Sequence, residues 1–285
     1  MAATSKAIRE KNGSHPFYAS LGRAYGGAIL FSFPILMTME MWYLGASLDG
    51  FRLALFTLLA IPMLIGLSYY DGFEDTSTIL GDVVDTFVAY TVGFTASAAM
   101  LLFFNVLNHQ MSADELIGKI AIQAIPASIG AVLAQSLLRS GDDSKSQAED
   151  RQRSATYVGL LFLMIAGAVF LSMSVAPTEE MVLISFQMSD WHTVALILAT
   201  VLLMHGFIHA VEYSGHSNAL TPDAPVWSIF LRYTVTGYAI VLLISFYILW
   251  TFGSTDGMHP MEQLKAAVVL AVPAAVGASA SRLIL

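Results

Sequence analysis

Four ionisable side chains share one face of a single apolar segment. His205, His209, Glu212 and His216 are spaced at i, i+4, i+7 and i+11, which places them within a sector of about 60° if one helix carries them all. Two imidazoles one turn apart, with a carboxylate three residues on, can relay protons near neutral pH or ligate a divalent metal. The spacing therefore favours a proton or cation pathway, or a metal site held by the first three residues.

A purely structural interpretation of this face stays open. His209 and Glu212 could serve only as hydrogen-bonding partners between helices, and Gly215-His216 could already be a loop. Zinc proteases with a His-Glu-x-x-His motif place the glutamate between the two histidines. Here Glu212 lies outside the histidine pair, so the spacing does not match that motif.

A second group of acids precedes another apolar segment. Five carboxylates lie between Asp71 and Asp85, and such groups concentrate cations at the mouths of cation pathways. Asp82 and Asp85 are three residues apart, so they share a face at the start of the segment. The alternative is that acids at a helix N-terminus only stabilise the macrodipole.

Two further charges stand alone within apolar sequence. Glu40 is flanked by methionine and tryptophan, so it must be protonated, pair with a cation or face a cavity. Arg232 could reach the membrane interface or pair with Glu212, Asp85 or Asp82. We include Glu40 and Arg232 in the candidate ion pathway.

The composition requires membrane helices to carry these residues. The chain is 56% hydrophobic and 12% charged, with a mean hydropathy of +0.67, and apolar runs of 18 or more residues indicate spanning helices. We predict an all-α, polytopic membrane protein. Its eight transmembrane segments are predicted at 24–44, 51–70, 80–106, 115–138, 155–175, 191–213, 226–252 and 262–283.

Other features limit the possible chemistry. The chain has no cysteine, which excludes disulfides, cysteine-ligated metals and thiol nucleophiles. Its net charge of −8 makes nucleic acid an unsuitable partner. No cofactor is expected apart from a divalent metal at the histidine face, and enzyme activity is the less favoured class.

The chain also contains two copies of one eight-residue motif. Residues 124–131 (AIPASIGA) and 271–278 (AVPAAVGA) align without gaps, and the same offset carries Glu115 onto Glu262. This self-similarity predicts a duplication, with Pro126 and Pro273 kinking equivalent helices. We predict a cytoplasmic tail at 1–23, a four-helix repeat at 24–138, a polar cytoplasmic linker at 139–154 and a second repeat at 155–285. In a separate match of Tyr25-Gly-Gly with Tyr157-Val-Gly, Glu40 falls near Ser172 and has no acidic counterpart.

The basic residues predict the orientation of the chain. With the N-terminus inside, ten of the thirteen Lys and Arg residues lie on the inner side, and only Arg52, Lys119 and Lys265 lie outside. The positive-inside rule therefore places both termini in the cytoplasm. An even number of spans per repeat gives the two repeats the same orientation.

One stretch is similar to known sequences. The segment Phe31–Gly45 contains Pro-x-x-x-Thr-Met-Glu-x-Trp. Together with Tyr-Thr-Val, Ile-Pro-Ala-Ser-Ile-Gly and the eight-span layout, it resembles a family of bacterial integral membrane proteins with no assigned function. The resemblance covers the chain from about Arg23. It implies a bacterial inner membrane location and supplies no activity.

The sequence thus favours a cation channel or ion-coupled transporter. In this hypothesis Glu212 is the central cation or proton site, and Asp82 and Asp85 form the inner vestibule. The expected partners are the lipid bilayer, a small cation or proton, and a second copy of the chain. The alternatives are an intramembrane metal-dependent enzyme using His205, His209 and Glu212, or a membrane scaffold or sensor without transport.

Overall fold

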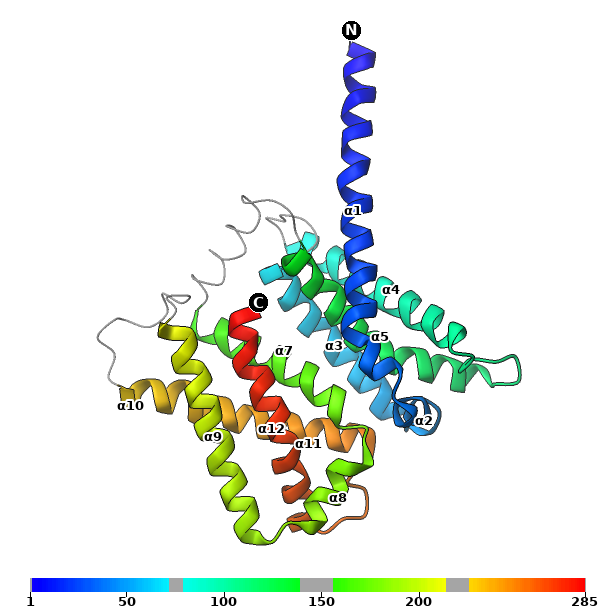
Figure 1. The fold of residues 1–285 in the computed structure, drawn as a ribbon. Coiled ribbons are helices and arrows are strands. Elements are labelled where there is room, and N and C mark those ends of the chain that lie inside the picture. Colours follow the sequence, from blue (N-terminus) through cyan, green and yellow to red (C-terminus); the bar gives the residue numbers. More distant parts are fainter. Residues whose placement is uncertain (1, 72–78, 139–155, 214–225, 285) are drawn as a thin grey trace.

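The computed structural model describes residues 2–71, 79–138, 156–213 and 226–284. Every regular element in these ranges is a helix (Figure 1). Seven of the helices are long and apolar enough to cross a membrane, and one bent pair makes an eighth candidate span. The prediction of an all-α polytopic membrane protein is therefore confirmed.

The helices fall into two halves separated by the segment 139–155. The first half contains α1 (Ala2–Leu36), α2 (Met39–Ser47), α3 (Gly50–Asp71), α4 (Ile79–Phe103) and α5 (Ala113–Leu138). The second half contains α7 (Tyr157–Val175), α8 (Glu179–Gln187), α9 (Asp190–Tyr213), α10 (Val226–Ile229), the π-helix η1 (Phe230–Val235), α11 (Thr236–Phe252) and α12 (Pro260–Ile284). Seven of the eight predicted spans agree with these helices to within a few residues.

One helix lies at the centre of each half. α5 packs against α1, α2, α3 and α4, and α12 packs against α7, α8, α9 and α11. Glycines allow the closest crossings, since a Cβ added at Gly130 would meet the carbonyl oxygen of Gly27, and one added at Gly277 would collide with that of Gly167. In lipid no hydrophobic effect drives helices together, so helices associate by packing closely at small residues.

The predicted span 24–44 is wrong as a single helix. α1 ends at Leu36, and α2 continues at 88° to it. Side chains satisfy the backbone groups that the break frees: the Thr38 hydroxyl donates to the Pro34 carbonyl at 2.8 Å, and the Trp42 indole donates to the Leu36 carbonyl at 2.7 Å. Such bonds permit a break within a membrane, where no water can replace them.

A second short helix, α8, follows α7 and was not predicted. α2 and α8 are both nine residues long, and each begins after a threonine in an extended conformation, Thr38 and Thr178. Glu40 is the second residue of α2 and Glu180 is the second residue of α8. Glu40 and Glu180 thus hold the same place in their own short helices.

The short helices and two connections lie at one face of the molecule. We call this the α2/α8 face, made of residues 37–53, 104–119, 176–193 and 253–265. Lys265 at the start of α12 donates to the carbonyl of Met188 after α8 at 3.0 Å, and Arg52 of α3 pairs with Asp256 of the connection before α12. The C-terminal ends of α3, α5 and α9 lie at the opposite face. There α1 extends beyond the other helices, so the predicted tail 1–23 falls on α1 (Figure 1).

Candidate functional site

His205 lies two turns before the end of α9 and is partly buried against η1. Its Nδ1 atom is 2.9 Å from the Thr234 hydroxyl oxygen, and its ring meets Phe230 edge-on at a centroid distance of 5.3 Å. Either the imidazole or the hydroxyl can donate in this bond, depending on the tautomer. His205 is therefore an ionisable group held in a defined orientation inside a membrane helix.

The partner of His205 belongs to a π-helical turn. A π turn contains one residue more than the matching α turn, which leaves carbonyls without their usual partners, and such turns are frequent at functional sites. The Tyr157 hydroxyl donates to the Arg232 carbonyl at 2.8 Å, and the Thr236 hydroxyl donates to the Leu231 carbonyl at 3.1 Å. The turn is thus stabilised by side chains from α7 and α11.

The other members of the histidine face are only partly described. His209 and Glu212 belong to α9, but their side chains lie outside the part of the chain that the structure describes, as does all of His216. The Arg232 side chain is exposed on η1. Its predicted pairing with Glu212 thus involves a side chain outside the described part.

The predicted metal site stays a prediction. Among the described side chains no group of three His, Cys, Asp or Glu residues could hold a metal ion. Two of the three proposed ligands, His209 and Glu212, lie outside that set. Elemental analysis of the purified protein and of His205→Ala would test it.

Asp82 and Asp85 lie in the first two turns of α4, within the first half of the molecule. They are 5% and 7% exposed, and each takes part in polar contacts. α4 packs against α1, α3 and α5, whereas His205 and Arg232 belong to the second half. The structure thus brings His205 and η1 together, and it places these two buried acids on a helix of the other half.

Glu40 is distant from both groups along the membrane axis. It lies in the first turn of α2, partly exposed at the α2/α8 face. α9 starts at that face and carries His205 towards the other one. A single cluster containing Glu40 and His205 is therefore not formed.

Comparison with known proteins agrees with this architecture. A family model described as "Putative integral membrane protein (DUF2391)" matches residues 20–285. The chain belongs to the DUF2391 family. No curated protein and no solved structure matches the chain. The family resemblance carried by Phe31–Gly45 is confirmed, and this DUF2391 protein is an integral membrane protein with several apolar helices.

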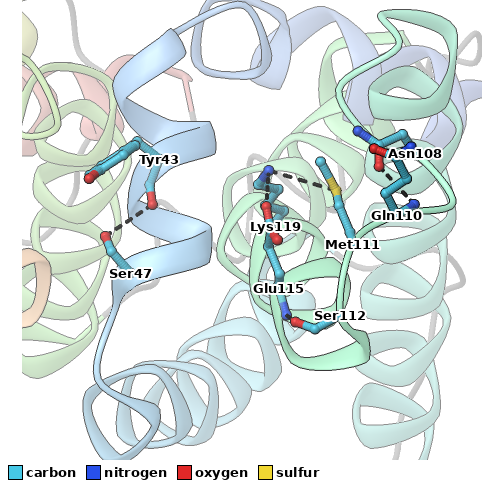
Figure 2. Close-up of polar contacts among 8 residues, drawn as sticks. All are labelled: Tyr43, Ser47, Asn108, Gln110, Met111, Ser112, Glu115 and Lys119. Carbon is cyan, nitrogen blue, oxygen red and sulfur yellow. Dashed lines mark hydrogen bonds and ion pairs between the residues drawn. The ribbon is translucent and has the colours of Figure 1, made fainter.

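The DUF2391 protein also has a polar ridge that the sequence analysis missed. Glu115, Lys119 and Gln123 follow one another at intervals of four residues on α5, and they become less exposed along the helix: the Glu115 side chain is 32% exposed, that of Lys119 is 9% exposed and Gln123 is fully buried. Lys119 Nζ is 2.7 Å from the Glu115 carboxylate and 3.8 Å from the Met111 sulfur (Figure 2). The i, i+4, i+8 spacing of these three polar residues in an apolar run could have revealed the ridge from the sequence.

The α2/α8 face of this protein is acidic. Its residue ranges contain nine carboxylates and three Lys or Arg residues. Each basic residue is already in an ion pair: Arg52 with Asp256, Lys119 with Glu115 and Lys265 with Asp190, at 2.7–2.8 Å. Six carboxylates remain in excess, which raises the local concentration of cations. They are Glu40, Asp49, Asp114, Glu179, Glu180 and Glu262.

Proposed function

We propose that this protein moves protons or a small cation across the membrane, as a channel or an ion-coupled transporter, with His205 as its titratable group. The observation that carries the proposal is the partly buried imidazole of α9 bonded to Thr234 in the π turn. Histidine changes its charge near neutral pH. Ionisable groups within spans face the protein interior or a water-filled cavity, and they mark proton and ion pathways.

Two features of the backbone support the same class of function. Transporters build their ion sites from helices that are interrupted within the membrane. Here α1 and α2 are separated by an 88° bend, and η1 interrupts the helix that continues as α11. The acidic α2/α8 face would supply cations to such a pathway.

We also infer that the two halves arose by duplication. The crossing of Gly27 with Gly130 corresponds to that of Gly167 with Gly277, and the threonines that start α2 and α8 correspond at the offset that relates Gly27 to Gly167. Equivalent helix crossings support a common origin of the two halves better than the repeated sequence motif alone. We propose that the halves share one orientation in a bacterial inner membrane, with the α2/α8 face outside, because that face has only three of the thirteen basic residues.

Flux measurements on liposomes test the transport proposal. The wild-type protein should dissipate a gradient of protons, Na⁺ or K⁺, and His205→Gln should slow that flux by about tenfold or more, because an amide cannot carry a proton. Thr234→Val should slow it less, since it removes one hydrogen bond of the imidazole and keeps the imidazole itself. Glu212→Gln should lose flux if the sequence prediction for that carboxylate holds.

His192→Gln is the matched control. His192 also belongs to α9, but it is exposed, and its ring bonds to Ser189 within its own turn at 2.7 Å. Its flux should equal that of the wild type. Equal flux in His205→Gln would remove the role of His205, and a wild-type protein that moves none of the three ions would contradict the transport proposal.

A further inference from the structure

Gln123 lies at the centre of the first half, and its polar side chain has no partner in the described part of the chain. It is fully buried, and neither its amide oxygen nor its amide nitrogen makes a hydrogen bond within the described residues. Buried polar atoms in native proteins almost always have a partner, which is protein, water or an ion. The amide of Gln123 is therefore a candidate to bind a water molecule or an ion.

Ser97 of α4 presents a second such group at a similar depth. It is fully buried and its hydroxyl is also without a partner among the described residues. On α4, Gly93 lies against Ala124 and Ser128 of α5, and Leu101 packs in one cluster with Ile120. Ser97 is one turn from both Gly93 and Leu101, so it lies at the level of residues 121–124 of α5.

The end of α1 lies beside Gln123. Around the axis of α5, Gln123 is about 20° from Gly130 and about 40° from Lys119. Gly130 lies against Gly27 and Phe31 of α1, and Lys119 lies against Gly45 of α2. Gln123 therefore faces the junction of these two helices.

The depth of Gln123 agrees with this placement. Leu36, the last residue of α1, packs in one cluster with Ile120, one turn from Gln123 on α5. The C-terminal end of a helix carries a partial negative charge. The Pro34 and Leu36 carbonyls there accept one hydrogen bond each from a side chain, and each oxygen keeps a second lone pair. The amide of Gln123 is thus close to the negative end of α1.

We propose that Gln123, Ser97 and the C-terminal turn of α1 form a binding site for a small monovalent cation. Neutral amide, hydroxyl and carbonyl oxygens are ligands that hard cations accept, and the ends of interrupted helices coordinate Na⁺ or protons in transporters. When the Gln123 oxygen binds the cation, its amide nitrogen can still donate to a carbonyl or to a bound water. The site deepens the proposed function and rests on it for its role, but cation binding is measurable without transport.

Thermal unfolding of the full-length protein in detergent tests the site. At constant ionic strength, replacing choline chloride by NaCl, KCl or LiCl should raise the wild-type Tm by about 5 °C at saturation for one of the three cations. Gln123→Leu should lose this shift, and Ser97→Ala should reduce it. Ser128→Ala is the matched control, because Ser128 is a buried serine of α5 whose hydroxyl already donates to Ala124; it should keep the shift.

The outcomes separate this site from the transport proposal. No cation-selective shift in the wild type, or an equal shift in Gln123→Leu, would overturn the site even if liposome flux through the His205 pathway were observed. A selective shift that Gln123→Leu abolishes and Ser128→Ala keeps would support it even if no flux were found. If Gln123→Leu does not fold, the cation-dependent Tm shifts of Ser97→Ala and Ser128→Ala are compared instead. A smaller shift in Ser97→Ala than in Ser128→Ala supports the site, and equal shifts overturn it.

Discussion

Gly167 and Gly277 show how single residues set the spacing between membrane helices. At each position an added Cβ would collide with the carbonyl oxygen of the other glycine, so the α7–α12 backbones are in direct contact. Pro273 lies one turn away on α12. A close crossing of this kind gains dispersion energy that larger residues would lose.

Gly167→Ala should therefore destabilise the protein. Relief of the clash requires the two helices to separate, and overpacking of this kind costs about 1–3 kcal/mol. The fall in Tm can be followed by thermal unfolding in detergent.

Gly206→Ala is the control for this change. Gly206 lies on α9 with nothing near its missing Cβ, so alanine should stabilise that helix by roughly 0.5–1 kcal/mol. A Gly167→Ala protein as stable as the wild type would contradict the close crossing.

At the scale of elements, the junction of α1 and α2 depends on hydrogen bonds from side chains. α1 ends at Leu36, and the carbonyls of Pro34 and Leu36 accept hydrogen bonds from the Thr38 hydroxyl and the Trp42 indole. Leu36 is fully buried, so water cannot replace the indole as donor. The bend is thus a feature specified by Trp42, six residues beyond the carbonyl that it caps.

Trp42→Phe should loosen this bend. The aromatic bulk stays, but the Leu36 carbonyl loses its donor, at an expected cost of about 1–3 kcal/mol. Unfolding in detergent measures the loss, and Trp191→Phe is the control because Trp191 is 82% exposed and should change stability little. Equal stability of the two variants would show that the indole bond is not needed.

At the scale of the whole molecule, the two halves meet through few contacts. Aromatic pairs such as Phe31 with Phe170 and Phe56 with Phe252 join them. At the α2/α8 face, Arg52 makes two hydrogen bonds to Asp256 at 2.8 and 3.0 Å and lies over the Trp250 ring. An apolar cavity of about 110 Å³ lies between α1, α3 and α5 on one side and α7 and α12 on the other, nearer the opposite face.

Cross-linking tests this arrangement of the halves. The chain has no native cysteine, so a short bifunctional thiol reagent should join the halves only in a protein carrying both Arg52→Cys and Asp256→Cys. A protease site inserted in the segment 139–154 then allows the joined halves to be seen as one band on a denaturing gel. Tyr18→Cys with Asp256→Cys is the control, because Tyr18 lies towards the opposite face. Two separate bands for the first pair would contradict the contact.

The helices themselves were predictable from the sequence. Hydrocarbon requires each backbone group to bond within its own helix, so the length and apolarity of a local run are sufficient to predict seven spans to within a few residues. Isolated polar residues such as His205, Asp82 and Asp85 were evident for the same reason. The span at 24–44 was predicted wrongly as one helix, because the hydrogen bonds that end α1 come from the side chains of Thr38 and Trp42.

Tertiary structure alone decided which polar groups meet. His205 and Thr234 are 29 residues apart, and nothing local indicates that a π turn presents Thr234 to α9. The separation of Asp82 and Asp85 from His205, and the burial of Gln123 beside the end of α1, also depend on how each helix is rotated and which neighbour it contacts. Helix rotation is set by packing between distant segments, such as the glycine crossings, and local sequence does not contain that information.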